Sequence, residues 1–477
     1  MMKLLRNIVV VLFILVGCME AIWGLGQLYG FVLSRHALFA ITGSFYNPGP
    51  YSGFLAMTFP IAFYEWLRRR RDTKSVAGLL AWMAMLLIGC LIPCGMSRTA
   101  WIAVAISAGY VALMHGRTRI AAFARKYRKG MILLGVVALV GIGIATSAAY
   151  TMKKDSADGR WLIWKVATQA VMERPFTGHG WHQVAGAYGQ AQESYFASGQ
   201  ATPAEEWVAG APEYVFNEYL QVAMAWGIPA LLLGLAVVGL ALRCAHSNGA
   251  YGLCGTLLSL LVFAFASYPL QFPEFVVTSL LLLAACIVSG KKMRITHVVA
   301  VWVMAIAGCA VYGYKYMEQK LVMQPWESSR MCYYSEDYAQ TAEAYAPMYE
   351  ALKWNPKYLF EYGHALHKLE RYEESSQVLE EALRHSSDPM ILNILGKNCQ
   401  SLKEYEEAEG WFIRSTHRLP NRLYPYYLLA KLYAEAGYYH PEKCHEMIRI
   451  VLQWKPKVPS EAIKEMKREM EILKEKR

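Results

Sequence analysis

The stretch VFNEYLQVAMAWGIPALLLGLAVVGLAL (215–242) decides the fold of this chain, because it is an apolar run with a polar start. About 20 consecutive apolar residues are enough to cross a bilayer as a helix. Asn217 and Glu218 stand at the beginning of this run, where polar side chains cost free energy unless they serve a purpose. The stretch therefore predicts a membrane span and raises the question of what the polar pair does.

The composition of the whole chain points the same way. The chain has 477 residues, of which 55% are hydrophobic and 18% charged, and its mean hydropathy is +0.20. A soluble protein carries about a quarter charged residues. Long apolar blocks fill residues 1–313, whereas residues 315–477 are polar and rich in Glu, Lys and Tyr. We therefore predict an all-α protein, with a polytopic transmembrane helical bundle (1–313) followed by a soluble domain (320–477).

A hydropathy pass at about 20 residues per span predicts nine membrane spans. The opening apolar run has no small-residue cleavage site, so we expect it to be the first span and not a signal peptide. The predicted spans are 8–30, 51–67, 76–93, 99–115, 131–150, 219–242, 250–268, 273–289 and 295–313.

The basic residues predict the orientation of these spans. The blocks RRRR (68–71), GRTRIAAFARKYRK (116–129) and KKMR (291–294) carry much of the net charge of +11. All of them fall on one side when the N-terminus is cytoplasmic, as the positive-inside rule requires. The prediction is a multi-pass membrane protein with a cytoplasmic N-terminus and with the loop 151–218 and the C-terminal domain outside the cytoplasm. Since the charge sits in such anchors, nucleic acid is not an expected partner.

Cysteine and histidine spacing gives no sign of a metal site. The ten cysteines are scattered without a CxxC pair, and His179 and His182 flank Trp181 without a third ligand nearby. We expect neither a metal nor another cofactor. The two histidines are either hydrogen-bonding loop residues or contacts to a substrate hydroxyl.

The C-terminal part of the chain is repetitive. Tyr372, Tyr405 and Tyr438 are spaced by 33 residues, and Pro356 and Pro389 keep the same interval. A period near 34 with recurring Gly, Ala, Tyr and Pro resembles tetratricopeptide repeats, which stack as helical hairpins. Such a stack predicts either a concave surface for a protein partner or a stabilising, oligomerising cap.

The loop 151–218 is too long for a simple connector, and loops of this length are usually functional. Asp158 is expected to cap a helix that starts near Gly159 and ends before Pro175. Its apolar residues predict a stripe along the outer membrane surface; they are Trp161, Trp164, Ala167 and Val171. The stretch YGQAQESYF (188–196) suits either carbohydrate stacking or interface packing.

Three arginines are candidates for an anionic ligand: Arg98, Arg160 and Arg174. A guanidinium stays charged and offers planar donors that match phosphate oxygens, so these side chains suit the pyrophosphate of a lipid-linked donor. The alternative for each is an anchor whose charged end reaches the membrane surface.

Five sequence elements together resemble the O-antigen ligase family of membrane glycan ligases and polymerases, over roughly residues 40–290. In chain order they are GSFYNPGPYSGFLA (43–56), SRTAW (97–101), GRWLIW (159–164), PFTGHG (175–180) and FNEYLQ (216–221). The repeat-containing C-terminal part is similar to that of family members from Bacteroides-like bacteria. Family members usually have more than nine spans, so we expect that the first spans are missing here or that the sequence is truncated.

The resemblance implies a metal-independent glycosyltransferase. Such an enzyme moves a glycan from an undecaprenyl-pyrophosphate carrier to an acceptor hydroxyl of a lipid, a polysaccharide or a protein, on the periplasmic face. It also implies that Arg98 and Arg160 bind the pyrophosphate and that Asn217 matches the asparagine of the family's HN-x-x-L motif. Arg174, His179, His182, Glu213 and Trp161 are then expected to contact substrate.

One departure from the family pattern concerns the base. Phe216 stands where the motif has histidine, and a phenyl ring cannot take a proton. Glu218 is the first candidate to replace it, ahead of Glu213 and His182, because a partly desolvated carboxylate is a stronger base. The alternative is that Asn217 and Glu218 only cap the helix that begins there.

Two other classes of protein compete with this enzyme. A transporter or flippase would need charged residues along a path through the spans, and Glu20 and Glu65 are the only acidic residues in or beside the first five. A membrane-anchored scaffold would work through its repeats alone.

Overall fold

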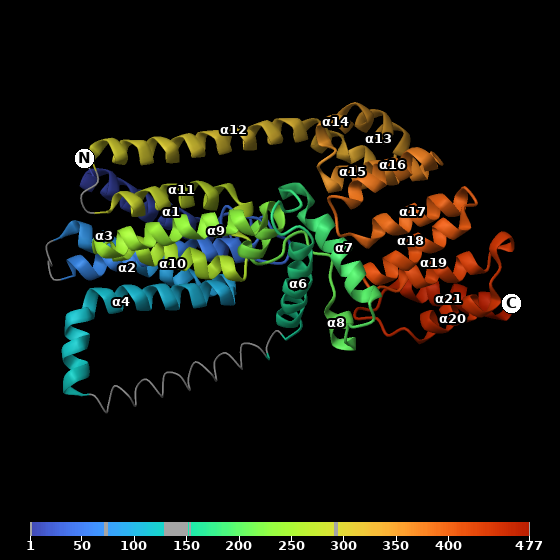
Figure 1. Cartoon of the computed structure of the whole chain (residues 1–477), viewed down its shortest axis with the longest axis horizontal. Helices are drawn as coiled ribbons and strands as arrows, with labels where there is room; N and C mark the ends of the chain where they lie inside the picture. The colour runs from blue at the N-terminus through green and yellow to red at the C-terminus, as the bar shows by residue number, and fades with distance from the viewer. Residues whose placement is uncertain (1, 71–74, 128–150, 152–153, 291–293, 477) are drawn as a thin grey trace. The chain divides into compact units, whose positions relative to one another are not determined.

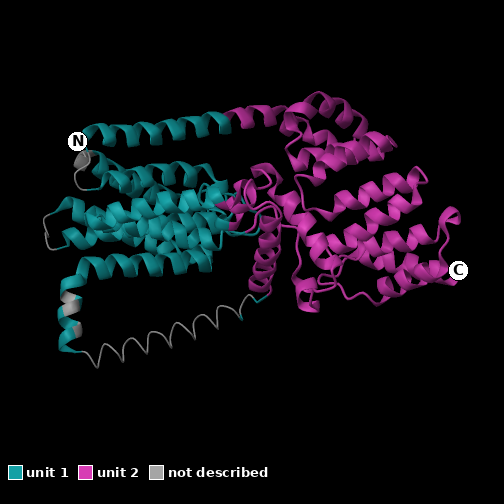
Figure 2. Ribbon diagram, viewed as in Figure 1, with its two compact units in different colours: residues 1–154, 216–219, 229–316 teal, residues 155–215, 220–228, 317–477 magenta. Residues whose placement is uncertain are grey.

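The computed structural model describes residues 2–70, 75–127, 151, 154–290 and 294–476. The regular elements of these ranges are all helices, without a strand, as the all-α prediction requires. The predicted span 131–150 lies outside the described residues. Two compact units divide the chain: residues 1–154, 216–219 and 229–316 form unit 1, and residues 155–215, 220–228 and 317–477 form unit 2 (Figure 2).

Unit 1 is a bundle of long apolar helices (Figure 1). Its helices are α1 (Met2–Leu28), α2 (Pro48–Arg69), α3 (Val76–Leu91), α4 (Arg98–Lys126), α10 (Tyr251–Phe265), α11 (Pro273–Val288) and the first part of α12 (Ile295–Tyr334). Helix α9 (Glu218–Ser247) also belongs to unit 1, except for its residues 220–228, which belong to unit 2. Among the residues that the structure describes, five stretches are long and apolar enough to cross a membrane: Leu5–Leu28, Val76–Gly95, Arg98–Thr118, Glu218–Ser247 and Ile295–Tyr334. Helices α10 and α11 are apolar but shorter. The count of nine spans stays a prediction.

Helix α2 is the centre of unit 1. It packs against α1, α3, α4 and α10, and its residues Tyr51, Phe54 and Leu55 are fully buried. Asn47 caps its start by accepting a hydrogen bond from the Gly49 amide, and Pro48 fixes the first helical turn. Because α2 is covered on all sides, it positions the helices around it.

The outward faces of unit 1 are apolar. Large side chains such as Leu12, Leu79, Leu233 and Met304 are about half or more exposed on α1, α3, α9 and α12. A protein surrounded by water rarely exposes contiguous apolar surface on this scale. Together with the long apolar helices, these faces support a multi-pass membrane protein.

Unit 2 joins the segment between α4 and α9 to the C-terminal helices. The first part contains α6 (Lys154–Glu173), the short helix η2 (Trp181–Gln183), α7 (Val184–Ala197) and α8 (Pro203–Val208). The second part follows α12 and contains α13 (Tyr338–Tyr345), α14 (Tyr349–Leu352), α15 (Pro356–Lys368), α16 (Tyr372–Leu383), α17 (Pro389–Ser401), α18 (Tyr405–Arg418), α19 (Tyr424–Tyr433), α20 (Pro441–Gln453) and α21 (Glu461–Lys476). We call residues 155–215 the loop segment and residues 317–477 the C-terminal domain.

Helical hairpins in the C-terminal domain follow the sequence period. Helices α15 and α17 begin at Pro356 and Pro389, and each is capped by the preceding Asn355 or Asp388. Their partners α16 and α18 begin at Tyr372 and Tyr405, which are again 33 residues apart. Helices α15 and α16 pack on each other, as do α17 and α18 and then α19 and α20.

Candidate functional site

Arg98 occupies the first position of α4 in unit 1. The Ser97 hydroxyl caps this helix by accepting from the Ala100 amide (3.4 Å), and the Trp101 indole donates to the Ile92 carbonyl (3.2 Å). The first turn of α4 contains no acidic residue, so a cation stands at the positive end of the helix dipole.

Asn217 and Glu218 form the start of α9, also in unit 1, and both are buried. The Asn217 side chain accepts a hydrogen bond from the Tyr219 amide (3.0 Å), so it acts as a helix cap, one of the two roles considered for it. Glu218 does not cap its own helix. Its Oε1 accepts from the Leu270 amide (2.7 Å) in the short helix η3 (Pro269–Gln271).

The second carboxylate oxygen of Glu218 is the most unusual atom of this region. Oε2 is buried and has no hydrogen-bond partner among the described residues. A buried oxygen of this kind costs free energy unless a proton or a donor satisfies it. A substrate hydroxyl is a donor of the required kind.

Residues with a left-handed backbone conformation precede both the SRTAW element (97–101) and the start of α9. Phe216 has φ of +52°, and its ring packs edge-on against Tyr268 with 5.1 Å between centroids. Met96, which precedes the SRTAW element, also has φ of +52°. This conformation costs free energy for residues other than glycine, and such backbone strain is found most often at functional sites.

Arg160 and Trp161 lie on α6 in unit 2. The structure starts this helix no later than Lys154, so Asp158 lies inside it and the expected cap at Asp158 is wrong. Neither glycine nor proline occurs between Lys154 and Asp158 to stop the helix there. The end before Pro175 is as predicted. Arg160 is half-buried, and Trp161 is 68% exposed.

The predicted apolar stripe of α6 does not face outward along its whole width. Ala167 and Val171 are buried inside unit 2, whereas the Trp161 side chain is exposed. Trp161 and Ala167 mark the two edges of an arc of about 120° on a helix with 3.6 residues per turn. The aromatic residues of 188–196 are buried as well, so Tyr188 and Phe196 are packing residues and are not exposed for stacking on a carbohydrate.

A polar network holds α6 against α7 and α8. Lys165 donates to the Tyr195 hydroxyl (2.6 Å) and to Glu205 (2.7 Å), and Tyr195 in turn donates to Glu205 (2.9 Å). Burial alone would raise the pKa of Glu205, but its hydrogen bonds, above all the one from Lys165, lower that pKa to about 2. Glu205 is therefore ionised at neutral pH, and the network fixes α6 one and a half turns beyond Arg160.

The other candidates of unit 2 have individual roles. The His179 Nε2 lies 2.8 Å from the Ala170 carbonyl, and since a carbonyl only accepts, this nitrogen carries the proton. Partial burial and the nearby His385 lower the pKa of His182, so it is neutral at pH 7. Glu213 is exposed and pairs with Lys357 (3.1 Å), while Arg174 is exposed next to Pro175.

The PFTGHG element (175–180) pairs with a break in α9. The His179 and Gly180 amides donate to the Met224 and Ala225 carbonyls (2.7 and 2.9 Å), and the Ile228 amide donates to the Pro175 carbonyl (2.7 Å). Gly227 has a non-helical conformation (φ 84°, ψ 169°) at this point. No single sequence motif predicts this pairing, although Gly227 and Pro229 inside an apolar run are a signal for it.

Gly227→Ala is expected to destabilise unit 2 strongly. A Cβ at this position would clash with the Phe176 carbonyl oxygen and approach that of Pro175 to 3.0 Å, in addition to the cost of the positive φ. We expect a fall of several degrees in the melting temperature of the purified protein, about what 2–3 kcal/mol of lost stability produces in a protein of this size.

Gly199→Ala is the matched control for this prediction. Gly199 also has a positive φ (68°), but nothing lies within 4 Å of an added Cβ. It therefore measures the backbone cost alone, about 1–2 kcal/mol. Equal melting temperatures for the two variants would show that the contact between 175–180 and the α9 break contributes nothing.

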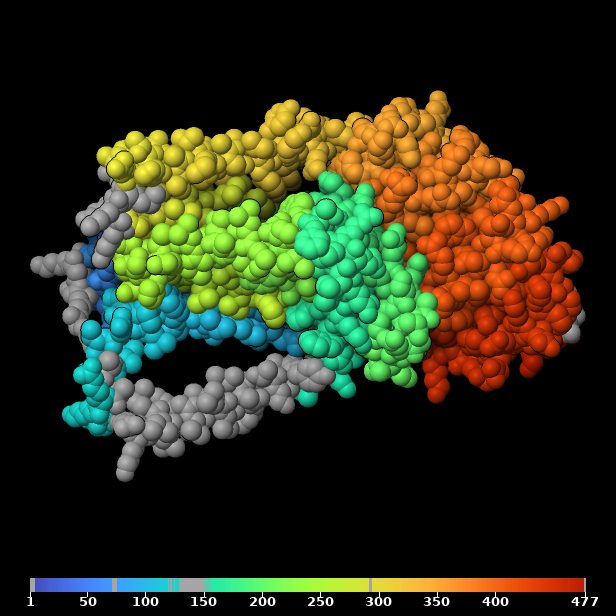
Figure 3. Space-filling view, viewed as in Figure 1, coloured from blue at the N-terminus to red at the C-terminus, as the bar shows by residue number. Residues whose placement is uncertain are grey.

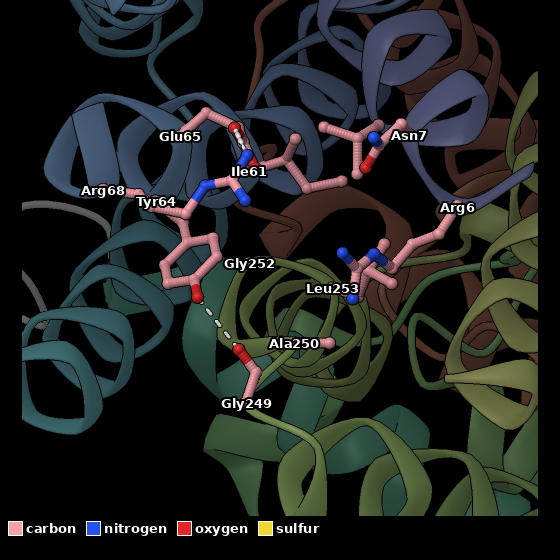
Figure 4. A pocket seen from close by; sticks show the side chains of 11 residues that line it. Arg6, Asn7, Ile61, Tyr64, Glu65, Arg68, Gly249, Ala250, Gly252 and Leu253 are labelled. Atoms are coloured by element: carbon pink, nitrogen blue, oxygen red, sulfur yellow. Dashed lines mark hydrogen bonds and ion pairs between the residues drawn. The ribbon is translucent and has the colours of Figure 1, made fainter. Parts of the chain in front are cut away.

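A small pocket lies at the other end of α2 from Asn47 (Figure 4). Arg6, Asn7, Glu65 and Arg68 line it, and the Arg68 guanidinium pairs with Glu65 (2.6 Å). Its volume of about 40 Å³ holds water molecules but not a saccharide. None of the predicted site residues lines it, so we do not place the site there.

Over the described residues, no group of three or more His, Cys, Asp or Glu side chains is arranged to hold a metal ion. The resemblance to the O-antigen ligase family predicts a reaction that needs no metal ion, and this stays a prediction.

The geometry thus defines a class, a helical multi-pass membrane protein with polar helix starts in unit 1 and an arginine-bearing loop segment in unit 2. Residues 82–235 match the sequence model of the O-antigen ligase family, which covers about a third of the chain. The match includes Arg98, Arg160, Asn217 and Glu218, and it supports a membrane glycan ligase or polymerase. No curated protein and no solved structure matches the chain.

Proposed function

We propose that this protein is a membrane glycosyltransferase, a glycan ligase or polymerase. It moves a glycan from an undecaprenyl-pyrophosphate carrier to an acceptor hydroxyl at the periplasmic face of the inner membrane. The observation that carries this proposal is the match of residues 82–235 to the O-antigen ligase family, because it spans every residue assigned to the chemistry.

The reaction is a direct displacement at the anomeric carbon. The bond between this carbon and the pyrophosphate oxygen breaks, and a bond to the acceptor oxygen forms. The carrier pyrophosphate leaves with the bonding electron pair, and Arg98 and Arg160 neutralise the charge that develops on it. Fixed charges aimed at a leaving group are usually the largest contribution to such a reaction.

Glu218 accepts the proton of the acceptor hydroxyl. Its Oε1 is held by the Leu270 amide, which orients the carboxylate, and the buried Oε2 has its hydrogen-bonding capacity left for the acceptor. Asn217 fixes the first turn of α9 and so the direction of the Glu218 side chain. Glu213 is a weaker candidate for the base, because it is exposed and neutralised by Lys357.

The substrate contacts outside this centre are assigned to the loop segment. Trp161 offers an exposed ring for a sugar or a lipid, and Arg174 an exposed cation for a phosphate. His179 and His182 position the turn around 175–183. We further propose that the C-terminal domain is a tetratricopeptide-repeat stack, on the basis of its 33-residue helical period.

The proposal is tested by the fate of the lipid-linked glycan in cells with and without the protein. A ligase predicts that complete chains accumulate on the carrier and disappear from the acceptor. A polymerase predicts that long chains are absent altogether and single repeat units remain. Unchanged glycans in both fractions would overturn the proposal, and glycan lost only from proteins would identify a protein acceptor.

A further inference from the structure

The loop segment and the C-terminal domain fold as one compact unit, although more than a hundred residues separate them in the chain (Figure 2). Helix α7 packs directly on α18. In the space-filling view the green loop segment lies against the orange and red C-terminal helices (Figure 3). The arrangement means that the C-terminal domain contacts the part of the protein that carries Arg160.

A buried ion pair lies at the centre of this contact. Arg418 is fully buried at the end of α18, and its guanidinium donates to Glu193 Oε1 on α7 through Nη2 (2.7 Å) and Nε (3.0 Å). Arg414 reaches the other oxygen of Glu193 (3.3 Å). Removing one member of such a pair leaves a buried charge without compensation, which is strongly destabilising.

Further contacts come from equivalent turns of the helical hairpins. In the turn after α16, His385 donates to the His182 carbonyl and Ser387 to the Pro212 carbonyl, both at 3.0 Å. In the turn after α18, Asn421 donates to the Ala209 carbonyl (2.8 Å). Trp354, one period before Ser387, packs its ring against that of His182 at 4.9 Å.

These turns form one edge of the C-terminal domain, which we call the docking edge: residues 353–355, 384–388 and 418–422. The face of α7 that contacts the docking edge lies so close to it that two of its glycines leave no room for a side chain. An added Cβ on Gly186 would clash with the Arg384 carbonyl, and one on Gly189 with the Arg418 guanidinium. Most of the polar groups joining the two parts are backbone carbonyls of the loop segment, so the docking edge fixes the path of the main chain there.

The contact extends to Arg160 through α6. Helix α7 carries Tyr195, whose hydroxyl accepts from Lys165 of α6. Lys165 stands five residues after Arg160 on the same helix. An unbroken series of hydrogen bonds and helix contacts therefore connects the docking edge to α6.

We propose that the C-terminal domain positions the arginine-bearing loop segment of its own chain, with Glu193 and Arg418 as positioning residues at the centre of the docking edge. The effect on glycan transfer rests on the proposed function, whereas the docking itself does not. The C-terminal domain is thus an internal support for the site, and any partner has to bind a surface other than the docking edge.

The test uses the full chain in detergent micelles and measures hydrogen exchange of α7 and α20. Glu193→Gln and Arg418→Gln are each expected to raise the exchange rate of the α7 amides by about tenfold or more while α20 is unchanged. The α7 amides of the double variant are expected to exchange no faster than those of the single variant with the larger effect, since each substitution removes the same interaction. The control is Arg371→Gln, which removes an exposed arginine paired with Glu374 and leaves α7 unchanged.

Asn421→Ala keeps the test valid if Arg418→Gln does not fold. It removes only hydrogen bonds to the loop segment and is expected to raise exchange around residues 206–210. Unchanged exchange of the loop segment in both Glu193→Gln and Asn421→Ala would overturn the proposal.

Kinetic measurements distinguish two roles of the Glu193–Arg418 ion pair: positioning of the loop segment and mere stabilisation of the folded protein. Glu193→Gln is expected to raise KM for the lipid-linked donor, because the Arg160 helix is displaced, whereas a loss of folded protein lowers only the apparent kcat. Faster exchange with an unchanged KM would overturn the positioning role. Faster exchange in a protein whose wild type transfers no glycan would support docking and reject the proposed function.

Discussion

Glycan transfer by the Arg160→Gln variant is expected to fall by about 100-fold or more, while the protein still inserts and folds. In the proposed reaction a leaving pyrophosphate develops charge, and loss of one fixed stabilising group for such a charge costs a factor of about 10²–10³. The measurement is the initial rate of transfer from a lipid-linked donor in membranes that contain equal amounts of variant and wild type.

Arg160→Lys and Arg371→Gln complete this experiment. Lysine keeps the charge but loses the planar fork of donors, so an intermediate rate is expected. Arg371→Gln removes an exposed arginine of the C-terminal domain and is expected to keep the wild-type rate. Transfer at the wild-type rate by Arg160→Gln would remove Arg160 from the site but leave the match of residues 82–235 to the O-antigen ligase family unaffected.

Glu218→Gln is expected to lower the rate of transfer by a similar factor of about 10² or more, the usual contribution of a general base. The substitution is nearly isosteric, and the amide oxygen of glutamine accepts the hydrogen bond from the Leu270 amide as before. The variant therefore keeps the tie between α9 and η3 and loses only the ability to take a proton.

Two further variants decide between the roles of Glu218. Glu350→Gln, at an exposed glutamate paired with Lys353, controls for the loss of one negative charge. Glu213→Gln tests the competing base. If Glu218→Gln transfers at the wild-type rate and Glu213→Gln does not, Glu218 is only a structural tie and Glu213 is the base.

Local sequence patterns predicted the elements well and their contacts poorly. The apolar runs marked most helices of unit 1, Pro175 marked the end of α6, and the interval between Pro356 and Pro389 marked the helices of the C-terminal domain. Each of these signals is contained in a window of a few turns. Asp158 shows the limit of such signals, because a good capping residue is also tolerated inside a helix.

The sequence proposes the candidate site as a set of residues but not as a geometry. The motifs selected Arg98, Arg160 and Asn217, but no pattern indicated that Glu218 hydrogen-bonds to the Leu270 amide, 52 residues away. The ion pair between Glu193 and Arg418 joins residues 225 positions apart. Contacts at such distances follow from how the helices pack in three dimensions, which single motifs do not encode.

Because of the docking edge, deletion of the C-terminal domain cannot distinguish an enzyme from a scaffold. Removing residues 320–477 would expose the buried face of α7, including Tyr188 and Gln192, and leave Glu193 without its partners. An enzyme and a scaffold would then both lose function. Point substitutions at Arg160 and Glu218 separate these two classes of protein, whereas the truncation does not.

The order of synthesis gives the docking edge a further consequence. The ribosome makes the loop segment first and the turns that hold it roughly 200 residues later, which takes on the order of 10–40 s at the usual rates of elongation. During that interval Glu193 and the carbonyls of residues 206–212 have no partners from the C-terminal domain. We therefore expect the loop segment to reach its final fold only after the last hairpins of the C-terminal domain have been made.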